Sequence, residues 1–371
     1  MERFETVIIG GGQAGLATGY HLKERGCRFV ILEAGERIGD SWRSRWDSLR
    51  LFTPAKYDGL PGLRFPAPRW SFPTKDEMGD YLEAYAARFE LPFQTGVYVD
   101  RVYRDGDRYV IESGHRTFEA ENVIVASGAH RTPKVPAFAS QLGLELTQLH
   151  SADYRNPAQL RDGGVLVVGA GNSGAEIAFE LARTHQVWQA GSVPGEIPVR
   201  HGSIPARFVL PVVRFLGMRV LTVKTPIGRR VGPKLAVKAT PLIRIKAKNL
   251  EAAGIERVPR VAGVRDGLPL LEDGRVLEVE NVIWCTGFRH EFSWIDLPVF
   301  AADGQLLHER GVVPSAPGLY FVGLVFQYAV ASDVLPGVGR DAAYIAEHLA
   351  KTVRAARPAA GPRLERALEL S

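Results

Sequence analysis

A chain of 371 residues, of which 46% are apolar and 23% charged, has the length and composition of a globular protein with two domains or one large domain. Cys27 and Cys285 form no C-x-x-C pair, which argues against a disulfide framework, a structural zinc site and the dithiol chemistry of disulfide reductases, and we expect no metal. No apolar run approaches the roughly 20 residues that span a bilayer, and no secretory signal precedes the first expected strand, so we expect a cytoplasmic protein.

The first fifteen residues predict a dinucleotide-binding unit. A β-branched apolar run at 6–9 predicts a buried parallel strand, and residues 10–15 then match G-x-G-x-x-G before a helical pattern that runs to about Arg25. These glycines allow a tight turn, the approach of backbone amides to a pyrophosphate, and close packing of helix and strand. A second apolar strand ends in Glu33, whose carboxylate can accept hydrogen bonds from a ribose. The cofactor-binding residues expected here are Gly10, Gly12, Gln13, Ala14, Gly15, Glu33 and Ala34.

The segment 39–54 is dense in aromatic and Arg residues and is interpreted as a loop. It is either an ordinary connection or it wraps the far end of the dinucleotide, with Trp42 stacking and Arg43 near polar edges. Its candidate cofactor-binding residues are Ser41, Trp42, Arg43 and Thr53. Further on, Thr74 and Glu77 form a capping-box pattern, which predicts a helix with an apolar stripe.

Residues 94–125 predict strands joined by turns, and the last strand ends in small residues at 126–128. The carboxyl end of such a strand is where cofactors bind in open α/β sheets. A strand near 319–322 also ends in glycine, and a helix opens near residue 339, where its N-terminus would stabilise negative charge on a reduced flavin ring. The expected cofactor contacts are Ala126, Gly128, Gly323 and Gly339.

A second G-x-G-x-x-G follows the apolar run 165–168 and predicts a second nucleotide site. Its expected cofactor-binding residues are Gly169, Gly171, Asn172, Ser173, Gly174 and Ser192. Gln189 stands where we expect the counterpart of Glu33. An acid at that position would bind the 2′-hydroxyl of NAD and repel the 2′-phosphate of NADP, so its absence favours NADPH over NADH. Ser192 could donate to the phosphate, and Arg200 or Arg207 could fold back toward it.

Residues 197–250 form a basic segment with twelve Lys and Arg and no Asp or Glu, whereas the whole chain has a net charge of only +5. Three interpretations stay open at this point. The segment is a surface that contacts an anionic membrane, an electrostatic funnel for NADPH or an acidic substrate, or a solvated helical insertion with a basic face. Nucleic-acid binding is disfavoured, because the segment has no interleaved aromatic residues and no reader motif.

Two dinucleotide loops, two similar strand–glycine junctions (122–128 and 281–288) and a closing helix are the parts of a flavoprotein with two dinucleotide-binding domains. The sequence resembles the flavin-containing monooxygenase group of class B flavoprotein monooxygenases, and within it the short bacterial and plant YUCCA-like branch. The stretches that carry the resemblance are the FAD loop at 10–33, the G-x-S-W-R-x-R segment at 39–45, the L-x-T-P stretch at 51–54, the NADPH loop at 169–174, the T-G-[YF] motif at 286–288, and the final FAD segment with Gly323 and Gly339.

The resemblance implies an α/β fold of two Rossmann-like, three-layer domains, with the NADPH domain inserted in the FAD domain. The ranges expected are 1–155 for the first part of the FAD domain, 156–280 for the NAD(P)H domain with its insertion 197–250, and 281–371 for the second part with a C-terminal helix. The resemblance also implies the reaction. NADPH, or alternatively NADH, delivers hydride to FAD, reduced flavin captures O₂ at C4a, and the hydroperoxide passes one oxygen to a small organic substrate at a nitrogen, sulfur or carbonyl centre.

Two candidate catalytic residues follow from the resemblance. The family fingerprint F-x-G-x-x-x-H-x-x-x-[YFW] falls on residues 144–154, where His150 and Tyr154 fit while Leu144 and Leu146 replace the Phe and Gly. Thr53 takes the place that an Asn holds beside the flavin in the animal and methylotroph enzymes. His150 is either a catalytic group or a residue that organises the linker between the domains.

The expected partners are a small-molecule substrate and O₂, with no nucleic acid, in a monomer or a homodimer. Two alternative functions remain. The first is a flavin NAD(P)H oxidase or reductase that transfers no oxygen. The second is a non-catalytic flavin-binding accessory protein that uses residues 197–250 as a docking surface.

Overall fold

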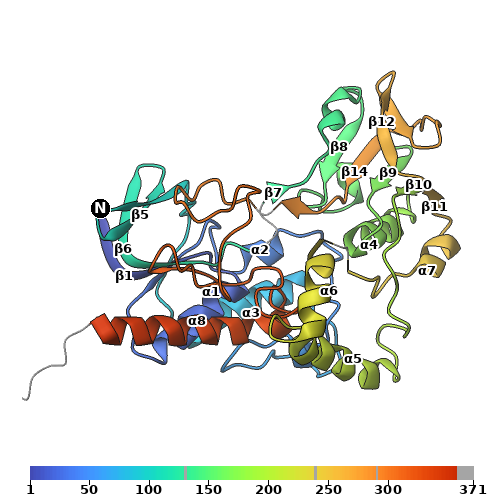
Figure 1. Cartoon of the computed structure of the whole chain (residues 1–371). Coiled ribbons are helices and arrows are strands. Elements are labelled where there is room, and N and C mark those ends of the chain that lie inside the picture. The colour runs from blue at the N-terminus through green and yellow to red at the C-terminus, as the bar shows by residue number, and fades with distance from the viewer. Residues whose placement is uncertain (129–131, 238–239, 290, 357–371) are drawn as a thin grey trace, which may run out of the picture.

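Two sheets with mainly parallel strands organise the chain, and helices pack around them (Figure 1). The computed structural model describes residues 1–128, 132–237, 240–289 and 291–356. The result confirms the expected mixed α/β class with two Rossmann-like sheets. The end of the third expected range, 357–371, lies outside the described residues. Within the described part of the chain, no helix is long and apolar enough to cross a membrane.

The first sheet has seven strands in the order β3-β2-β1-β6-β5-β4, with β16 also paired to β6. The strands are β1 (Glu2–Ile9), β2 (Val30–Leu32), β3 (Phe93–Gln94), β4 (Arg101–Asp105), β5 (Arg108–Ser113), β6 (Arg116–Val125) and β16 (Leu319–Phe321). Strand β1 is parallel to both β2 and β6, with Val7 opposite Val30 and Val123. A central parallel strand is covered on both faces, which is why Val7, Ile8 and Ile9 are all buried.

The second sheet has five strands in the order β11-β10-β9-β14-β8, and every pair is parallel. The strands are β8 (Thr147–His150), β9 (Val165–Val168), β10 (Val187–Ala190), β11 (Glu256–Val258) and β14 (Asn281–Trp284). Two short antiparallel pairs join β12 (Val261–Arg265) to β13 (Leu268–Leu271) and β7 (Thr132–Pro133) to β15 (Phe288–Arg289). The second sheet therefore comes from chain that lies between β6 and β16 of the first.

The sheet pairings differ from the expected domain ranges at both junctions. Strand β8 lies before residue 155 and β14 lies after residue 280, yet both pair within the second sheet. Strand β14 sits beside β9 as β6 sits beside β1. The likeness of 281–288 to 122–128 thus reflects equivalent places in two sheets, and the sequence analysis assigned residues 281–284 to the wrong one.

The helices are α1 (Gln13–Lys23), α2 (Asp40–Arg43), α3 (Lys75–Arg88), α4 (Asn172–Leu181), α5 (Ala206–Phe215), α6 (Pro226–Val237), α7 (Ala247–Ala252) and α8 (Leu335–Ala356). Short turns of 3-10 helix are η1 (Ala55–Tyr57), η2 (Ala137–Gln141) and η3 (Pro157–Gln159), and η4 (Leu216–Val220) is a turn of π-helix. Helix α2 shows that the segment expected to be a loop contains one helical turn. The capping box of α3 is confirmed, since Thr74 Oγ1 accepts from the Glu77 amide and the Thr74 amide donates to Glu77 Oε2.

The apolar stripe of α8 holds the C-terminal helix against α1, which brings both ends of the first domain together. Ala342, Ile345, Ala346 and Leu349 are fully buried in the same core as Leu16. Burial of each large side chain in this stripe contributes about 1.5–3 kcal/mol relative to leaving it in water. The N-terminus of α8 is thereby fixed beside the N-terminal half of the chain, where the first glycine loop lies.

The basic segment 197–250 is not a freely solvated insertion. It carries α5, η4 and α6, and Figure 1 shows α5 and α6 near one end of α8, where Arg340 Nη1 donates to the Met218 carbonyl. The Val223 amide donates to the Tyr328 carbonyl over 2.8 Å, and the Val330 amide donates to the Leu221 carbonyl over 3.2 Å. At its other end, Arg244 Nη1 donates to the Arg50 carbonyl over 3.0 Å. The segment is therefore fastened to the first domain at both ends.

Candidate functional site

The two glycine loops have the same backbone geometry in the two sheets. Gly10 and Gly169 adopt φ values of 109° and 126°, which a side chain would strain. A Cβ at Gly15 would lie 1.9 Å from the Gly10 carbonyl oxygen, and a Cβ at Gly174 would lie 2.0 Å from that of Gly169. Each loop therefore requires glycine at its first and last positions, so that helix and strand can pack closely.

The first loop fits a dinucleotide. Gly12 is the N-cap of α1, and a Cβ placed there would meet no atom within 4 Å, so the space in front of the helix is open. Gln13 and Ala14 precede the first intrahelical bond, which the Leu16 amide donates to the Gly12 carbonyl. Amides at this position point out of the helix toward a bound anion, with the positive end of the helix dipole behind them.

Glu33 lies at the tip of β2 and orders the loop. Its Oε2 accepts from the Gly11 amide over 2.6 Å, and its Oε1 accepts from the Gly35 amide over 2.8 Å. A carboxylate offers about four acceptor positions, so two remain for ribose hydroxyls. Glu33 thus fits the expected role and also fixes the loop itself, while its neighbour Ala34 is exposed beside it.

The other small residues expected at the first site gather at the carboxyl edge of the same sheet. A small cavity there is lined by Gly128 and Gly323 among others, and it borders the ends of β6 and β16. Buried Ala126 directly follows β6, and its carbonyl would clash with any Cβ on Gly10. Gly339 lies in the first part of α8, where a Cβ would be 2.8 Å from Pro61 Cγ. Gly128 and Gly323 therefore border one space, whereas Gly339 packs against Pro61 and does not line it.

The segment of α2 divides into residues that face this site and residues that do not. Trp42 Nε1 donates to Gln13 Oε1 over 3.3 Å, which places the indole beside the start of α1, and Ser41 is exposed next to it. Arg43 differs from the expectation. Its guanidinium donates five hydrogen bonds, to Ile38, Asp40, Asp80 and Glu83. Because a guanidinium has only five N–H donors, Arg43 holds α2 against α3 and has none left for a cofactor.

The second loop corrects the assignment of Gln189. The Gly10 amide donates to the Leu32 carbonyl, and the equivalent bond of the second loop joins the Gly169 amide to the Ala190 carbonyl. The counterpart of Glu33 is therefore the residue after Ala190, which is Gly191. Gln189 lies two residues before Gly191 and is buried. Its Nε2 lies 3.4 Å from the Gly169 carbonyl oxygen. The predicted position was two residues too early because β10 continues to Ala190.

A glycine in place of the acid leaves room for a phosphate, and a cation lies beside it. Arg260 Nη2 donates to Ser192 Oγ over 3.2 Å. Arg260 follows β11, 68 residues after Ser192, so no local signal in the sequence joins the two. Of the two cations proposed from the sequence, Arg207 lies with its guanidinium 5.6 Å from the Trp70 ring centre, on the first domain.

Asn172 also differs from the expectation, whereas Ser173 remains a predicted contact. The Asn172 side chain donates to the Pro241 carbonyl over 3.0 Å and accepts from the Ile243 amide over 3.0 Å. It therefore ties the end of the basic segment to α4, and only its backbone amide remains for a nucleotide. Ser173 is half-buried in the first turn of α4, after the N-cap Gly171, where its hydroxyl can reach a phosphate.

A buried carboxyl lies behind Thr53. Thr53 Oγ1 donates to Asp58 Oδ1 in a short hydrogen bond, and Asp58 Oδ2 has no partner although the residue is 0% exposed. Burial raises the pKa of Asp58 to about 7, against the opposing effect of the Thr53 hydrogen bond. Asp58 was missed from the sequence because an Asp before Gly is typical of an ordinary turn.

His150 lies at the junction of the two domains with both ring nitrogens bound to backbone. Its Nδ1 accepts from the Ala152 amide over 3.1 Å, so its Nε2 carries the proton and donates to the Gly287 carbonyl over 3.0 Å. Burial lowers the pKa of His150, mainly by desolvation. Its ring also packs edge-on against Phe288. This geometry favours the role in which His150 organises the linker.

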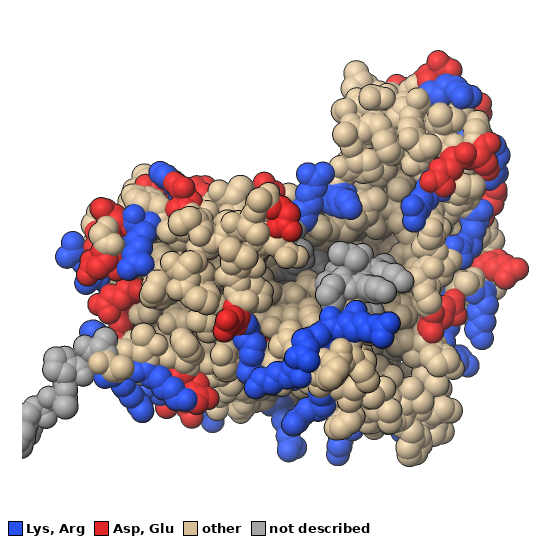
Figure 2. Space-filling view, viewed as in Figure 1, with Lys and Arg blue, Asp and Glu red and all other residues tan. Residues whose placement is uncertain are grey.

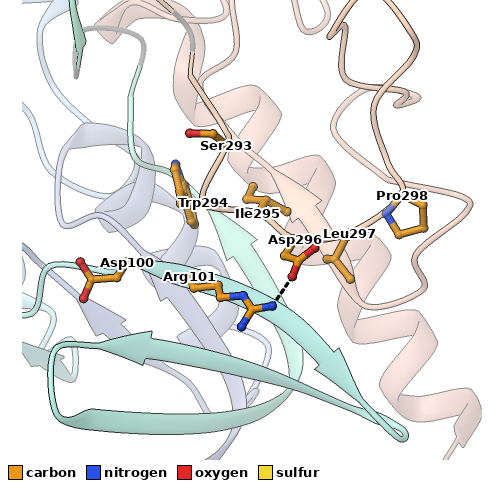
Figure 3. Close-up of a pocket in the computed structure, with 8 residues that line it drawn as sticks. All are labelled: Asp100, Arg101, Ser293, Trp294, Ile295, Asp296, Leu297 and Pro298. Atoms are coloured by element: carbon orange, nitrogen blue, oxygen red, sulfur yellow. Dashed lines mark hydrogen bonds and ion pairs between the residues drawn. The ribbon is translucent and has the colours of Figure 1, made fainter.

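Figure 2 shows a hollow between the two lobes, with Lys and Arg side chains along its rim. Such a rim favours the approach of an anionic nucleotide to this hollow. A second hollow lies elsewhere, at the edge of the first sheet (Figure 3). It is lined by Asp100, Arg101 and residues 293–298, and the Arg101–Asp296 ion pair spans it in the open. None of the expected site residues lines this second hollow.

The described residues offer no arrangement suited to a metal ion or to dithiol chemistry. These residues contain no group of three or more His, Cys, Asp and Glu that could hold a metal. Cys27 packs at the edge of the core beneath α1, whereas Cys285 belongs to the core of the second domain. Burial raises the pKa of the Cys285 thiol to about 12, so it is not a nucleophile.

Comparison with known proteins places the chain among flavin-dependent oxidoreductases. Residues 7–190 match the family model described as pyridine nucleotide-disulphide oxidoreductase. The chain is 38% identical to a protein of Geobacillus kaustophilus named "Uncharacterized oxidoreductase CzcO-like", over 92% of this chain and 97% of that one. It is 30% identical to "Probable indole-3-pyruvate monooxygenase YUCCA7" of Arabidopsis thaliana, over 93% and 87%. Among solved structures, a flavin-containing monooxygenase from Stenotrophomonas maltophilia has a TM-score of 0.75 at 29% identity, covering 95% of this chain and 100% of that one.

Proposed function

Because the chain belongs to the flavin-containing monooxygenase family and is a flavin-dependent pyridine nucleotide oxidoreductase, we propose that it uses FAD, NADPH and O₂ to oxygenate a small organic substrate at a nitrogen, sulfur or carbonyl centre. In this proposal the first sheet, with α1 and α8, holds FAD. The second sheet, with α4, holds NADPH. The Arabidopsis relative supports oxygenation, because it is named as a probable monooxygenase.

One observation carries the assignment of the two nucleotides. The two loops are equivalent in backbone geometry, but Glu33 follows the strand at the first loop and Gly191 follows it at the second. A carboxylate at this position suits the unmodified ribose of FAD and would repel a 2′-phosphate. At the second loop the acid is absent, and Ser192 and Arg260 supply a hydroxyl and a cation instead. This supports NADPH as the reductant, with NADH as the weaker donor.

The residues of the chain would bind, orient and shield the reacting groups. FAD, when bound, supplies the redox chemistry that amino-acid side chains lack. Gly12 and the start of α1 would hold the pyrophosphate, and the N-terminus of α8 would lie near the ring and favour negative charge there. Thr53 would present its oxygen lone pairs to the site, because its proton is donated to Asp58. His150 would keep the two domains in register through Gly287.

The geometry at Thr53 also supports a second candidate function. A threonine whose only proton is donated to a buried carboxyl gives no hydrogen bond to a cofactor or to an oxygen species. An enzyme of this kind would reduce flavin with NADPH and release hydrogen peroxide without oxygenating a substrate. This second candidate is a flavin NAD(P)H oxidase, and it shares every cofactor-binding residue with the first.

An isotope experiment separates the two candidates. The FAD-loaded protein is supplied with NADPH and isotopically labelled dioxygen, together with a thioether, a tertiary amine, a cyclic ketone or a 2-keto acid. The proposal predicts label in at least one product by mass spectrometry, with less hydrogen peroxide than NADPH consumed. Equal amounts of peroxide and oxidised NADPH, with every added compound unlabelled, would support the oxidase instead.

A further inference from the structure

Helix α5 presents an apolar face to solvent. Ile204 precedes the helix, and Phe208, Val212 and Phe215 follow it at intervals of three or four residues, so these three share one side of the helix. The four side chains are, in that order, 69%, 74%, 56% and 59% exposed. Apolar side chains in the cores of this protein are less than one-tenth exposed, and contiguous exposed patches of this kind mark interaction surfaces.

The other side of α5 is fastened to the protein, so the apolar face cannot turn inward. Ala206 is buried at the start of the helix. The guanidinium groups of Arg207 and Arg214 lie 5.6 Å and 5.2 Å from the ring centres of Trp70 and Tyr57. The turn after α5 is also held, since Arg340 Nη1 donates to the Met218 carbonyl over 2.6 Å. Figure 1 shows α5 at the outer edge of the molecule, beneath α6.

The positive charge around this face favours an anionic partner. Residues 197–250 carry twelve Lys and Arg and no Asp or Glu. Arg229 and Arg230 are exposed on the adjoining α6, and Figure 2 shows Lys and Arg side chains bordering the apolar region at α5. A fixed helix with one apolar face and cationic flanks matches a lipid surface with anionic headgroups.

We propose that α5 docks the protein on an anionic phospholipid bilayer. Phe208 and Phe215 enter the boundary between headgroups and acyl chains, and Arg229 and Arg230 lie over the headgroups. The contact is peripheral, because the described residues include no helix that could cross the bilayer. This surface stands apart from the nucleotide loops, so the proposal does not depend on the proposed function.

A second copy of the chain is a poorer occupant of the same face. In a two-fold dimer the same patch meets itself, so Arg229 and Arg230 of the two copies would approach one another, and residues 197–250 contain no acid to pair with them. Like charges at that distance repel, and burial would increase the repulsion. An anionic lipid surface, in contrast, neutralises the cations while the phenyl rings leave water.

The test is flotation of the FAD-loaded protein with vesicles. One set of vesicles contains phosphatidylcholine alone, and the other contains equal parts of phosphatidylcholine and phosphatidylglycerol. We expect binding to the second set, weakened by salt, and little binding to the first. Replacing both rings (Phe208→Ser with Phe215→Ser) should lower the partition coefficient by about tenfold or more, since two buried aromatic side chains are lost.

Two further variants separate lipid binding from general effects. Leu144 is 100% exposed on the second domain, so Leu144→Ser is a matched control that should bind vesicles like the unaltered protein. Arg229→Glu with Arg230→Glu should weaken binding to phosphatidylglycerol and remove its salt dependence in part. The proposal is overturned if the unaltered protein does not float with anionic vesicles, or if Leu144→Ser weakens binding equally. It is also overturned if the Phe variant changes only the sedimentation coefficient, which would identify a dimer interface.

Discussion

Replacing Asp58 with Asn should remove a pH-dependent loss of stability. Asp58 is fully buried, faces no cation and has one oxygen without a partner, while Thr53 donates to the other oxygen. Tyr81 interacts electrostatically with Asp58, but burial raises the pKa of Tyr81 to about 12, so Tyr81 stays neutral in this range. Asn keeps the shape and the acceptor for Thr53 but cannot ionise.

The magnitude follows from the raised pKa. The usual value of 3.8 becomes about 7 in the folded protein, so between these pH values the folded state keeps a proton that the unfolded state has lost. Stability then falls as pH rises, by about 1.4 kcal/mol for each pH unit, and the loss reaches about 4 kcal/mol at neutral pH. Above pH about 7 the loss is complete and constant. Asp58→Asn should therefore match the unaltered protein near pH 4 and exceed its stability by several kcal/mol near pH 8.

The assay is urea denaturation across this pH range with saturating FAD, and the quantity compared is the difference between the two proteins. Burial also raises the pKa of Glu176 to about 7, but its contribution is present in both proteins and cancels. The exposed Asp107→Asn is a matched control that should leave the pH dependence unchanged. If Asp58→Asn follows the unaltered protein in parallel from acid to neutral pH, Asp58 does not hold a proton and the reasoning is refuted.

Three further predictions concern the nucleotide sites and the junction. Gly12→Val should abolish FAD binding, because its side chain fills the open space before α1; a yellow variant would show that the pyrophosphate lies elsewhere. Arg260→Ala should raise the KM for NADPH about tenfold and leave that for NADH unchanged, with the exposed Arg257→Ala as control; equal effects on both nucleotides would remove Arg260 from the phosphate site. His150→Asn should cost about 1–3 kcal/mol of stability without shifting the pH profile of kcat, and a shifted profile would indicate direct proton transfer.

The sequence was sufficient for features that depend on short stretches of chain. Both glycine loops were found because strand, turn and helix follow one another within about 20 residues and each glycine has its own steric reason. The capping box at Thr74 was found for the same reason. The basic character of residues 197–250 was also visible in the sequence, although the orientation of helix α5 was not.

Features that depend on tertiary contacts were not predicted. The 68-residue separation of Arg260 from Ser192 has no local signature, and the true counterpart of Glu33 depended on which carbonyl the Gly169 amide bonds. Arg43 was assigned to the cofactor because an exposed-looking Arg in a loop suggests a ligand, whereas α3 supplies two carboxylates that occupy it. Strand β14 was placed in the wrong sheet because its apolar pattern fits either one.

The most direct test of the central claim is the reaction of the reduced, FAD-loaded protein with O₂ in rapid mixing, with and without NADP⁺. A monooxygenase must hold activated oxygen until a substrate arrives. We therefore predict that NADP⁺ delays the return of oxidised-flavin absorbance, that a distinct absorbance transient precedes it, and that hydrogen peroxide appears only as the transient decays. A single rapid phase, with stoichiometric peroxide whether or not NADP⁺ is present, would contradict the claim and identify the protein as an oxidase.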